Sequence, residues 1–439
     1  MHLRVGTRAT KIGATVLLAA AVGAVLPASP LVASLLVLVV VVAAIAACFD
    51  VLGLAILLVG TLPWLVTMSD LLPRLTVTFA SGATAGAILL IAAPRSTRGE
   101  ASLALRVGVV LFFAPIVLSL GRQGAAAGAV QAAKYVLFPA MAFVVAEATN
   151  ERELGYLRTV AFWNSVGAIA VNLIFGLTGF ANSSYYGSGE ILGYGSEHEL
   201  ALLAGCVTAA ALASSLSLAW SPVIAVGAIA TVATGVRATL PGLVFAAFAR
   251  MRSAGVRLRV MVLVGLSVAG IFVSGAAHVV EARFHHGEQG GEFRSFSSFG
   301  SGRGSIYQAA LHTWWNASPF SWIVGTGLRT IHGVEQEVLG QGFGGHSDIV
   351  DVVVQIGIAG LIGLILIWFV LFAKATSKLP LVILLSFAVF TGILEVSGPL
   401  VIGMLFATGT NLVAWPRAVR RGVRATSVPP IPPLRRQPT

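Results

Sequence analysis

Long apolar runs, separated by short polar breaks, repeat along this chain from Lys11 to Trp415. A helix of about twenty apolar residues crosses the hydrocarbon core of a bilayer, and most of the runs approach that length. A transmembrane β-barrel would show alternating apolar and polar positions instead. The pattern therefore predicts an all-α, polytopic transmembrane bundle of about 12–14 spans. The predicted spans are residues 12–27, 31–49, 51–68, 75–93, 103–120, 126–147, 157–177, 198–216, 220–234, 238–249, 258–276, 346–373, 379–395 and 399–415.

The composition agrees with a membrane protein. Hydrophobic residues make up 57% of the chain and charged residues 10%, whereas a soluble domain carries about 25% charged residues. Both cysteines, Cys48 and Cys206, lie inside apolar runs, so neither a disulfide framework nor a thiolate metal site is indicated. The first run has the pattern of a signal peptide, but the spans that follow it at once favour a first transmembrane helix.

The net charge of +11 is distributed unevenly. With the N-terminus in the cytoplasm, most Lys and Arg residues fall on the cytoplasmic side, as the positive-inside rule requires. The excess charge therefore predicts contact with anionic membrane lipids and not with nucleic acid. Both chain ends are then cytoplasmic, and residues 416–439 form a disordered tail.

This topology depends on a break within residues 220–249, which are too long for one span at ~1.5 Å per residue. Two short helices turning at Gly235 keep the following arginines inside and place Arg237 at membrane depth, in a cavity open to the outside. Residues 277–345 are then the one large extracytoplasmic loop, with short helices. It separates the N-terminal helices, 1–276, from the C-terminal helices, 346–415.

Four basic residues on the outer side or within the spans are candidate ligands for a phosphate group. Arg237 suits a diphosphate because guanidinium binds it bidentately; the alternative is a structural pair with a carboxylate or with free carbonyl groups. Arg303 lies between glycines, at the predicted start of a short helix over residues 305–315, where an anion would compensate the unfavourable dipole; the alternative is a solvated loop arginine. Arg122 and Lys134 are weaker candidates of the same kind.

His346 follows a glycine-rich stretch and precedes a long apolar helix whose start, with Ser347 or Asp348 as cap, is expected to favour an anion. A histidine there can act as a general base, and Asp348 or Asp351 can orient it or do the same work. The alternative is a capped helix with an interfacial histidine. The pair at 285–286 does not predict a metal site, because adjacent residues rarely chelate one ion.

Three tryptophans fall in the predicted outer loop. They fit an aromatic belt at the membrane interface or a platform on which sugars stack. The tryptophans are Trp314, Trp315 and Trp322.

Two segments, "GSGRGSIYQAALHTWWNASPFSWIVGTGL" (300–328) and "GGHSDIVDVVVQIGIAGLIGLIL" (344–366), together resemble the O-antigen ligase and polymerase superfamily of bacterial membrane glycosyltransferases. The superfamily pattern is G-R-x-x-x-(W/Y)-x-x-A, a proline, a G-x-G-L turn, and a histidine before a helix with G-x-x-G-L. "TGVRATLPGL" is similar to its arginine-bearing helix start, with Val236 where serine is usual. The matching residues are Gly302, Arg303, Tyr307, Ala310, Pro319, Gly325, Gly327, Leu328, His346, Ser347, Gly357, Gly360 and Leu361.

The resemblance implies a GT-C-like fold and a metal-independent transferase without a cofactor. Its donor would be a polyprenyl-diphosphate-linked oligosaccharide, and its acceptor a glycan, a lipid or a wall polymer. The active site would face the outside of the bacterial cytoplasmic membrane. The sequence does not distinguish a polymerase from a ligase. The implied catalytic residues are His346, Arg237 and Arg303, and the substrate-binding candidates are Arg122, Lys134, Asp348 and Tyr307.

Two other functions compete with this one. A transporter or flippase for lipid-linked glycan would also be polytopic, but it needs no large outer loop. A structural partner in a cell-envelope complex would leave the arginine and histidine motifs without a role.

Overall fold

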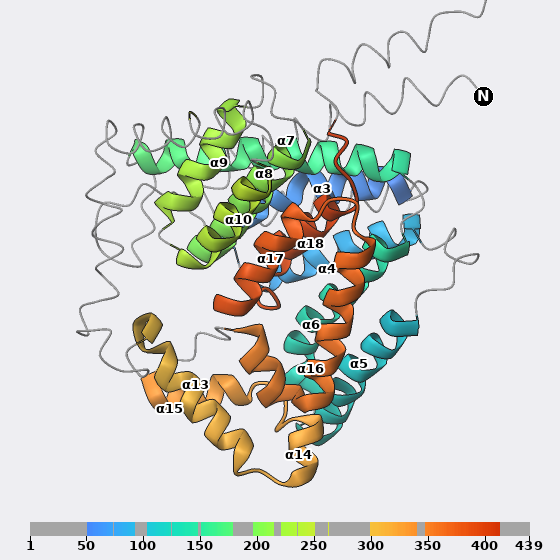
Figure 1. The fold of residues 1–439 in the computed structure, drawn as a ribbon, viewed down its shortest axis with the longest axis vertical. Coiled ribbons are helices and arrows are strands. Elements are labelled where there is room, and N and C mark those ends of the chain that lie inside the picture. Colours follow the sequence, from blue (N-terminus) through green and yellow to red (C-terminus); the bar gives the residue numbers. More distant parts are fainter. Residues whose placement is uncertain are drawn as a thin grey trace, which may run out of the picture.

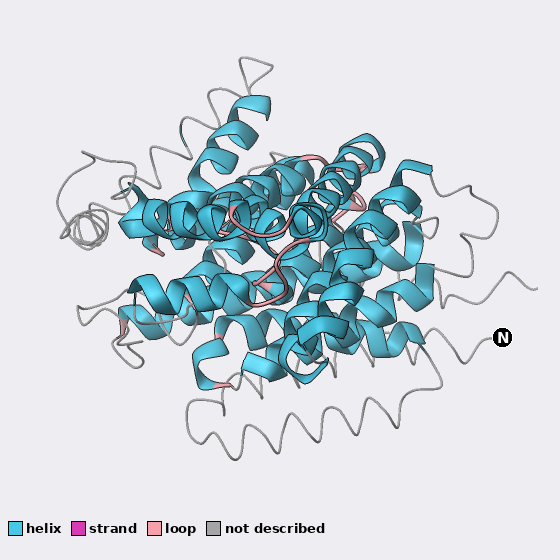
Figure 2. Cartoon of the chain, turned by 90° about the horizontal axis from the view of Figure 1, so that it is seen from below, coloured by secondary structure: helices cyan, strands magenta, loops and turns pink. Residues whose placement is uncertain are grey.

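The computed structural model describes residues 51–72, 74–92, 103–123, 125–147, 151–178, 196–214, 221–234, 236–250, 262, 299–339 and 347–412. This part of the chain consists of helices joined by loops and contains no strand (Figure 2). The predicted spans 12–27 and 31–49, nearly all of 258–276 and the tail 416–439 lie outside it. The elements are α3 (Val51–Thr67), η1 (Ser69–Leu71), α4 (Arg74–Ala92), α5 (Leu103–Gln123), α6 (Ala125–Glu147), α7 (Glu151–Leu177), α8 (Glu197–Ser214), α9 (Ser221–Ala233), η5 (Arg237–Thr239), α10 (Leu240–Arg250), α13 (Phe299–Trp315), α14 (Pro319–Val324), α15 (Thr330–Leu339), α16 (Asp348–Lys374), α17 (Leu379–Phe390) and α18 (Ser397–Ala407).

Four of these helices are long and apolar enough to cross a membrane, and six shorter helices are also apolar. The all-α class is confirmed for the described residues, and the helices indicate a membrane protein. The four long helices contain Leu103–Leu120, Gly128–Glu147, Glu151–Leu177 and Asp348–Lys374.

Helices α5 and α16 run side by side (Figure 1) and approach closely at two glycines. A Cβ on Gly363 would lie 2.6 Å from the carbonyl oxygen of Gly108, and one on Gly108 would lie 3.1 Å from the oxygen of Gly363. Small residues of this kind let apolar helices pack backbone against backbone in a bilayer, where the hydrophobic effect does not drive helices together.

Side-chain hydrogen bonds join helices elsewhere in the bundle. The indole N–H of Trp64 on α3 donates to the side-chain oxygen of Asn164 on α7 at 3.1 Å, and the side-chain amide of Asn172 on α7 donates to the backbone oxygen of Thr67 at 2.8 Å. The hydroxyl groups of Ser81 on α4 and Ser397 on α18 lie 3.2 Å apart. These buried polar groups therefore have partners on neighbouring helices, as an apolar environment favours.

The predicted break within residues 220–249 is confirmed. The segment forms α9 and α10 with η5 between them, and both helices pack on α8. Ser386 on α17 donates to the backbone oxygen of Ala238 at 2.6 Å, so η5 is fixed against the end of α17. At ~1.5 Å per residue neither short helix reaches across a ~30 Å core. The turn between them therefore lies within the bundle.

The prediction of one helix over 379–395 is wrong at its end. Helix α17 stops at Phe390, where Gly392 takes a φ of 94° and its N–H donates to the Phe387 carbonyl at 2.8 Å. A non-helical segment, residues 391–396, then leads into α18. Because α17 and α18 are also short, this second turn lies within the bundle, near the first.

Helix α13 begins at Phe299 and not at residue 305 as predicted. Arg303 therefore lies inside the helix, so the prediction of an arginine at the helix start, compensated by an anion, is wrong. Helices α13, α14 and α15 follow one another, and α13 and α15 pack together and against α16.

Candidate functional site

The two motif segments meet at a break in α16. Gly357 has φ 73° and ψ −172°, a conformation that only glycine adopts readily, so α16 consists of two helices joined at this residue. A Cβ on Gly357 would lie 2.3 Å from the carbonyl oxygen of Ile323, and one on Gly325 would lie 2.1 Å from that of Gln355. The glycines of the G-x-G-L turn and of α16 are therefore both required for one close backbone approach.

The turn also satisfies the carbonyl groups that the break releases. The backbone N–H and the hydroxyl of Thr326 both donate to the Val354 oxygen at 2.8 Å, and the Gly327 N–H donates to the Gln355 oxygen at 3.2 Å. A helix can break within a membrane when neighbouring groups take up its free backbone atoms in this way.

The side chain of Gln355 connects the turn to α6. Its carbonyl oxygen accepts from the Arg329 N–H at 2.7 Å, and its amide donates to the Tyr135 hydroxyl at 2.9 Å. The Leu328 N–H donates to the Ser119 hydroxyl on α5 at 2.7 Å. Since Gln355 and Tyr135 are buried, these bonds fix the turn between α5, α6 and α16.

Asp348, at the start of α16, holds the segment between α17 and α18. Its two carboxylate oxygens accept from the N–H groups of Ile393 at 3.0 Å and Leu394 at 3.2 Å. Ser347 occupies the cap position of α16 without a side-chain cap bond, so the prediction of a side-chain cap from Ser347 or Asp348 is wrong. Asp348 is buried and occupied by backbone amides, which argues against its acting as the base.

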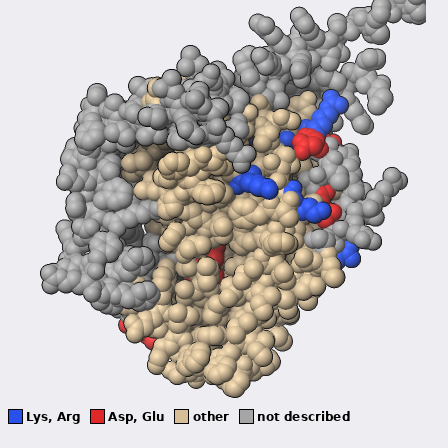
Figure 3. Space-filling view, in the orientation of Figure 1, with Lys and Arg blue, Asp and Glu red and all other residues tan. Residues whose placement is uncertain are grey.

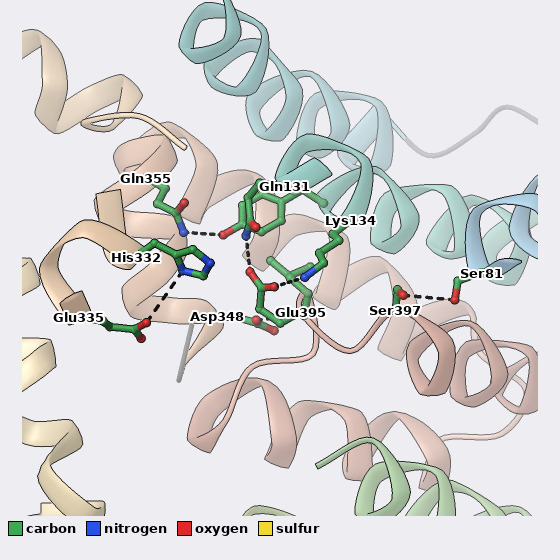
Figure 4. A network of polar contacts seen from close by, with 11 residues as sticks. Ser81, Gln131, Lys134, His332, Glu335, Asp348, Gln355, Glu395 and Ser397 are labelled. Atoms are coloured by element: carbon green, nitrogen blue, oxygen red, sulfur yellow. Dashed lines mark hydrogen bonds and ion pairs between the residues drawn. The ribbon is translucent and has the colours of Figure 1, made fainter. Parts of the chain in front are cut away.

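Glu395 lies between two polar side chains of α6 (Figure 4). Lys134 donates to one carboxylate oxygen at 2.5 Å, and Gln131 donates to the other. The side chains of Lys134 and Glu395 are 21% and 17% exposed, so the pair is partly accessible although Lys134 belongs to a predicted span. The charge of Lys134 is thus matched by Glu395, which supports a structural role. Its role as a phosphate ligand stays a prediction.

Further acids surround this pair. Asp351 is buried and lies close enough to Asp348, Glu395 and Glu335 for their charges to interact. His332 on α15 lies 3.9 Å from the carboxylate of Glu335 (Figure 4). Figure 3 shows acidic atoms in a recess near the centre of this face of the molecule. The start of α16 therefore lies among several carboxyl groups, a setting less suited to the anion that its helix dipole was expected to attract.

The structure describes the backbone around most predicted site residues but not every side chain. Arg237 begins η5, Arg303 lies on α13 and Arg122 lies near the end of α5, and these three side chains are outside the described part. His346 itself lies outside it, one residue before Ser347. Tyr307 is half-buried on α13. The catalytic and binding roles of these residues remain predictions.

The elements that carry these residues are nevertheless connected. The backbone of η5 accepts a hydrogen bond from Ser386, in the last turns of α17. Helix α17 leads directly into segment 391–396, whose amides are bound by Asp348. Asp348 lies two residues after His346 in the sequence. Helix α13 packs against α16 and α15 at the same end of the molecule (Figure 1). The described contacts thus link η5 to α17, the segment 391–396 after α17 to the start of α16, and α16 to α13.

The sequence analysis did not identify Glu395, Gln131, Gln355 or the contact between His332 and Glu335 on α15. A signal for Glu395 existed, because it is the single charged residue between Lys378 and Arg417. An ionisable residue within an apolar segment is by default a candidate for function. No comparable signal marks Gln131 or Gln355, whose importance comes from partners far away in the sequence.

No protein-family model matches this chain, and no curated protein matches it either. The fold and the site define a helical membrane protein with a polar, predominantly acidic region between short and broken helices.

Proposed function

We propose that this protein is a membrane glycosyltransferase that transfers or polymerises glycan from a polyprenyl-diphosphate-linked donor onto an acceptor hydroxyl. The observation that carries the proposal is the contact between Gly325 and Gly357. It joins the two segments that resemble the O-antigen ligase and polymerase superfamily and supplies a physical reason for their glycines. A carrier has no evident need for this joint.

The proposed reaction forms a bond between the acceptor oxygen and the anomeric carbon while the bond from that carbon to the lipid diphosphate breaks. His346 takes the hydroxyl proton, and the diphosphate leaves with the bonding electrons. Arg237 and Arg303 would stabilise the charge that develops on it, an effect that is strongest in a dry site. The donor bond supplies the energy, so the proposed step needs neither a nucleotide nor a metal.

The charge of the described region supports a division of roles within the proposal. The start of α16 is acidic, which suits a neutral, hydroxyl-bearing acceptor better than a diphosphate. The donor diphosphate would then lie towards η5 and α13, on the arginine side. The proposed location is the bacterial cytoplasmic membrane, with both chain ends inside and this region open to the outside.

The test is conversion of a polyprenyl-diphosphate-linked oligosaccharide by the purified protein in nanodiscs, with products separated by mass. His346→Ala should abolish conversion, and His312→Ala, at an exposed histidine of α13, should not. Arg237→Lys should lose most activity, because a point charge does not replace a bidentate guanidinium, whereas Arg106→Lys, at an exposed site on α5, should retain it. Normal turnover by His346→Ala would refute the assigned base.

One observation favours a second function, a transporter or flippase for lipid-linked glycan. Buried acids paired with a lysine at membrane depth also occur in proton-coupled carriers. In sealed vesicles, a carrier would move unchanged lipid-linked glycan between leaflets and respond to a proton gradient. Product formation without a gradient would exclude this alternative as the main activity.

A further inference from the structure

The corner formed by the end of α13 and by α14 exposes large apolar side chains. Trp315, Phe320 and Ile323 are 64%, 49% and 56% exposed. No Asp, Glu, Lys or Arg occurs in the sequence from Gly304 to Leu328. A solvated loop of this length would be expected to carry charge. Figure 3 shows neither basic nor acidic atoms on the surface around α14.

This corner has a fixed shape. The rings of Trp315 and Trp322 stack with centroids 5.5 Å apart and planes 23° from parallel. The indole N–H of Trp322 donates to the Trp315 backbone oxygen at 3.0 Å. Ser318 caps α14 through its hydroxyl, which accepts from the Ser321 N–H at 3.3 Å. The exposed apolar side chains are therefore held outward by local structure.

The α13–α14 corner adjoins an apolar face of α16, a helix predicted to span the membrane. Helix α14 packs on α16 at the break, with the Ile323 carbonyl against Gly357. Beyond the break, exposed side chains on α16 recur every three or four residues and form one stripe along the helix. The members of this stripe are Ile358, Ile362, Ile365 and Phe369.

The residues next to this corner indicate its depth in the membrane. Leu328, four residues after α14, is bonded to Ser119 near the end of α5, and its side chain lies next to Gly128 near the start of α6. Both of these helix ends are predicted to lie at the outer surface. The second half of α16 runs from Gly357 to Lys374. At ~1.5 Å per residue this half is roughly 27 Å long, close to the thickness of a bilayer core. Gly357, and α14 beside it, therefore lie at the outer boundary of the hydrocarbon.

We propose that the α13–α14 corner is inserted into the outer leaflet, at the boundary between headgroups and acyl chains, and that its partner is the lipid bilayer itself. Tryptophans with one polar edge prefer this boundary, and an uncharged apolar surface stabilises insertion there. The corner would hold α13 at headgroup level. The predicted outer loop is then partly a membrane-bound element. This inference does not depend on the proposed glycosyl transfer.

A fluorescent label on single introduced cysteines tests the proposal in nanodiscs. Phe320→Cys and Ile323→Cys report on the corner, Ile365→Cys on the stripe of α16, and Gln336→Cys, at an exposed position on α15, on a solvated site. The unsubstituted protein, labelled in parallel, measures the background from Cys48 and the buried Cys206.

We expect lipids with a nitroxide near the headgroup to quench labels at 320 and 323 at least twofold more than a nitroxide deep in the acyl chain does. The label at 365 should show the opposite order, and the label at 336 should respond to a water-soluble quencher alone. If labels at 320 and 323 behave like the label at 336, the corner is solvated and the proposal fails. Protection from both kinds of quencher would also overturn it, because another copy or another part of the chain would then cover the corner.

Discussion

The ion pair between Lys134 and Glu395 predicts that removing one partner destabilises the protein more than removing the other. Removing Lys134 leaves Glu395 without its cation beside Asp348 and Asp351, whereas removing the charge of Glu395 leaves a lysine near other carboxylates. Lys134→Met should therefore destabilise the protein more than Glu395→Gln, although both changes break the same contact.

The magnitude follows from the geometry. Breaking a fully buried pair from one side costs about 3–5 kcal/mol, and solvent screening lowers that cost here because the side chains are 21% and 17% exposed. We expect a loss of about 2 kcal/mol for Lys134→Met and about 1 kcal/mol for Glu395→Gln. The double variant leaves no unpaired charge, so its loss should be smaller than the sum by about 1 kcal/mol.

Thermal unfolding in detergent can be followed in a Cys48→Ala background with a dye that fluoresces on reaction with a thiol, because Cys206 is buried in α8 and becomes accessible as the bundle opens. A loss of 2 kcal/mol corresponds to a midpoint lower by about 2 °C for a chain of this length. Lys378→Met, at an exposed lysine before α17, is the matched control and should change the midpoint little. Additive losses, or a larger effect of Glu395→Gln, would refute the reasoning.

Three further substitutions test the joint and the acidic region with the same assay. Gly357→Ala should destabilise the protein by about 3 kcal/mol or more, because it adds backbone strain to a steric clash. Gly333→Ala on α15, where a Cβ meets open space, is the control and should be neutral. Equal midpoints for the two variants would count against the Gly325–Gly357 joint. Gln355→Leu should cost about 1–3 kcal/mol, because the Arg329 N–H loses its acceptor, and an unchanged midpoint would show that this bond contributes little. Asp351→Asn should raise the midpoint, because it removes an ionisable group that is buried and lies near three other carboxyl groups. It should also lower activity, a trade-off typical of functional residues, and a lower midpoint would contradict this account of Asp351.

The hydrophobic pattern predicted most helices because burial in lipid needs long apolar runs, and the positions of α4, α8 and α9 follow it closely. It also predicted the break near Gly235, since a single helix would have been too long. The hydrophobic pattern did not predict that α17 ends at Phe390, although Gly392 is a residue type that commonly follows a helix end. Part of the cause is Asp348, more than forty residues earlier, which holds the amides of Ile393 and Leu394.

The candidate site was predictable in its motifs but not in its charge. Gly325 and Gly357 were both visible in the sequence, yet their contact requires knowledge of which backbone faces which. The helix dipole at the start of α16 suggested an anion site, and that reasoning considered the helix alone. The carboxyl groups of Glu335 on α15 and Glu395 before α18 lie near Asp351 and oppose the effect of the helix dipole, and no local pattern connects them with α16.

This reversal bears on the proposed chemistry. A diphosphate carries several negative charges, and bringing it against a group of carboxylates in a medium of low dielectric would be strongly unfavourable. A sugar hydroxyl, in contrast, donates hydrogen bonds and is stabilised by nearby carboxylates as it loses its proton. In the proposed reaction His346, the residue before Ser347, would take the proton of this acceptor. In the proposed reaction the donor anion would instead be held by Arg237 on η5 and Arg303 on α13. Under the proposal the two charge types would separate the two substrates, and an anionic acceptor should be used less efficiently than a neutral one of the same size.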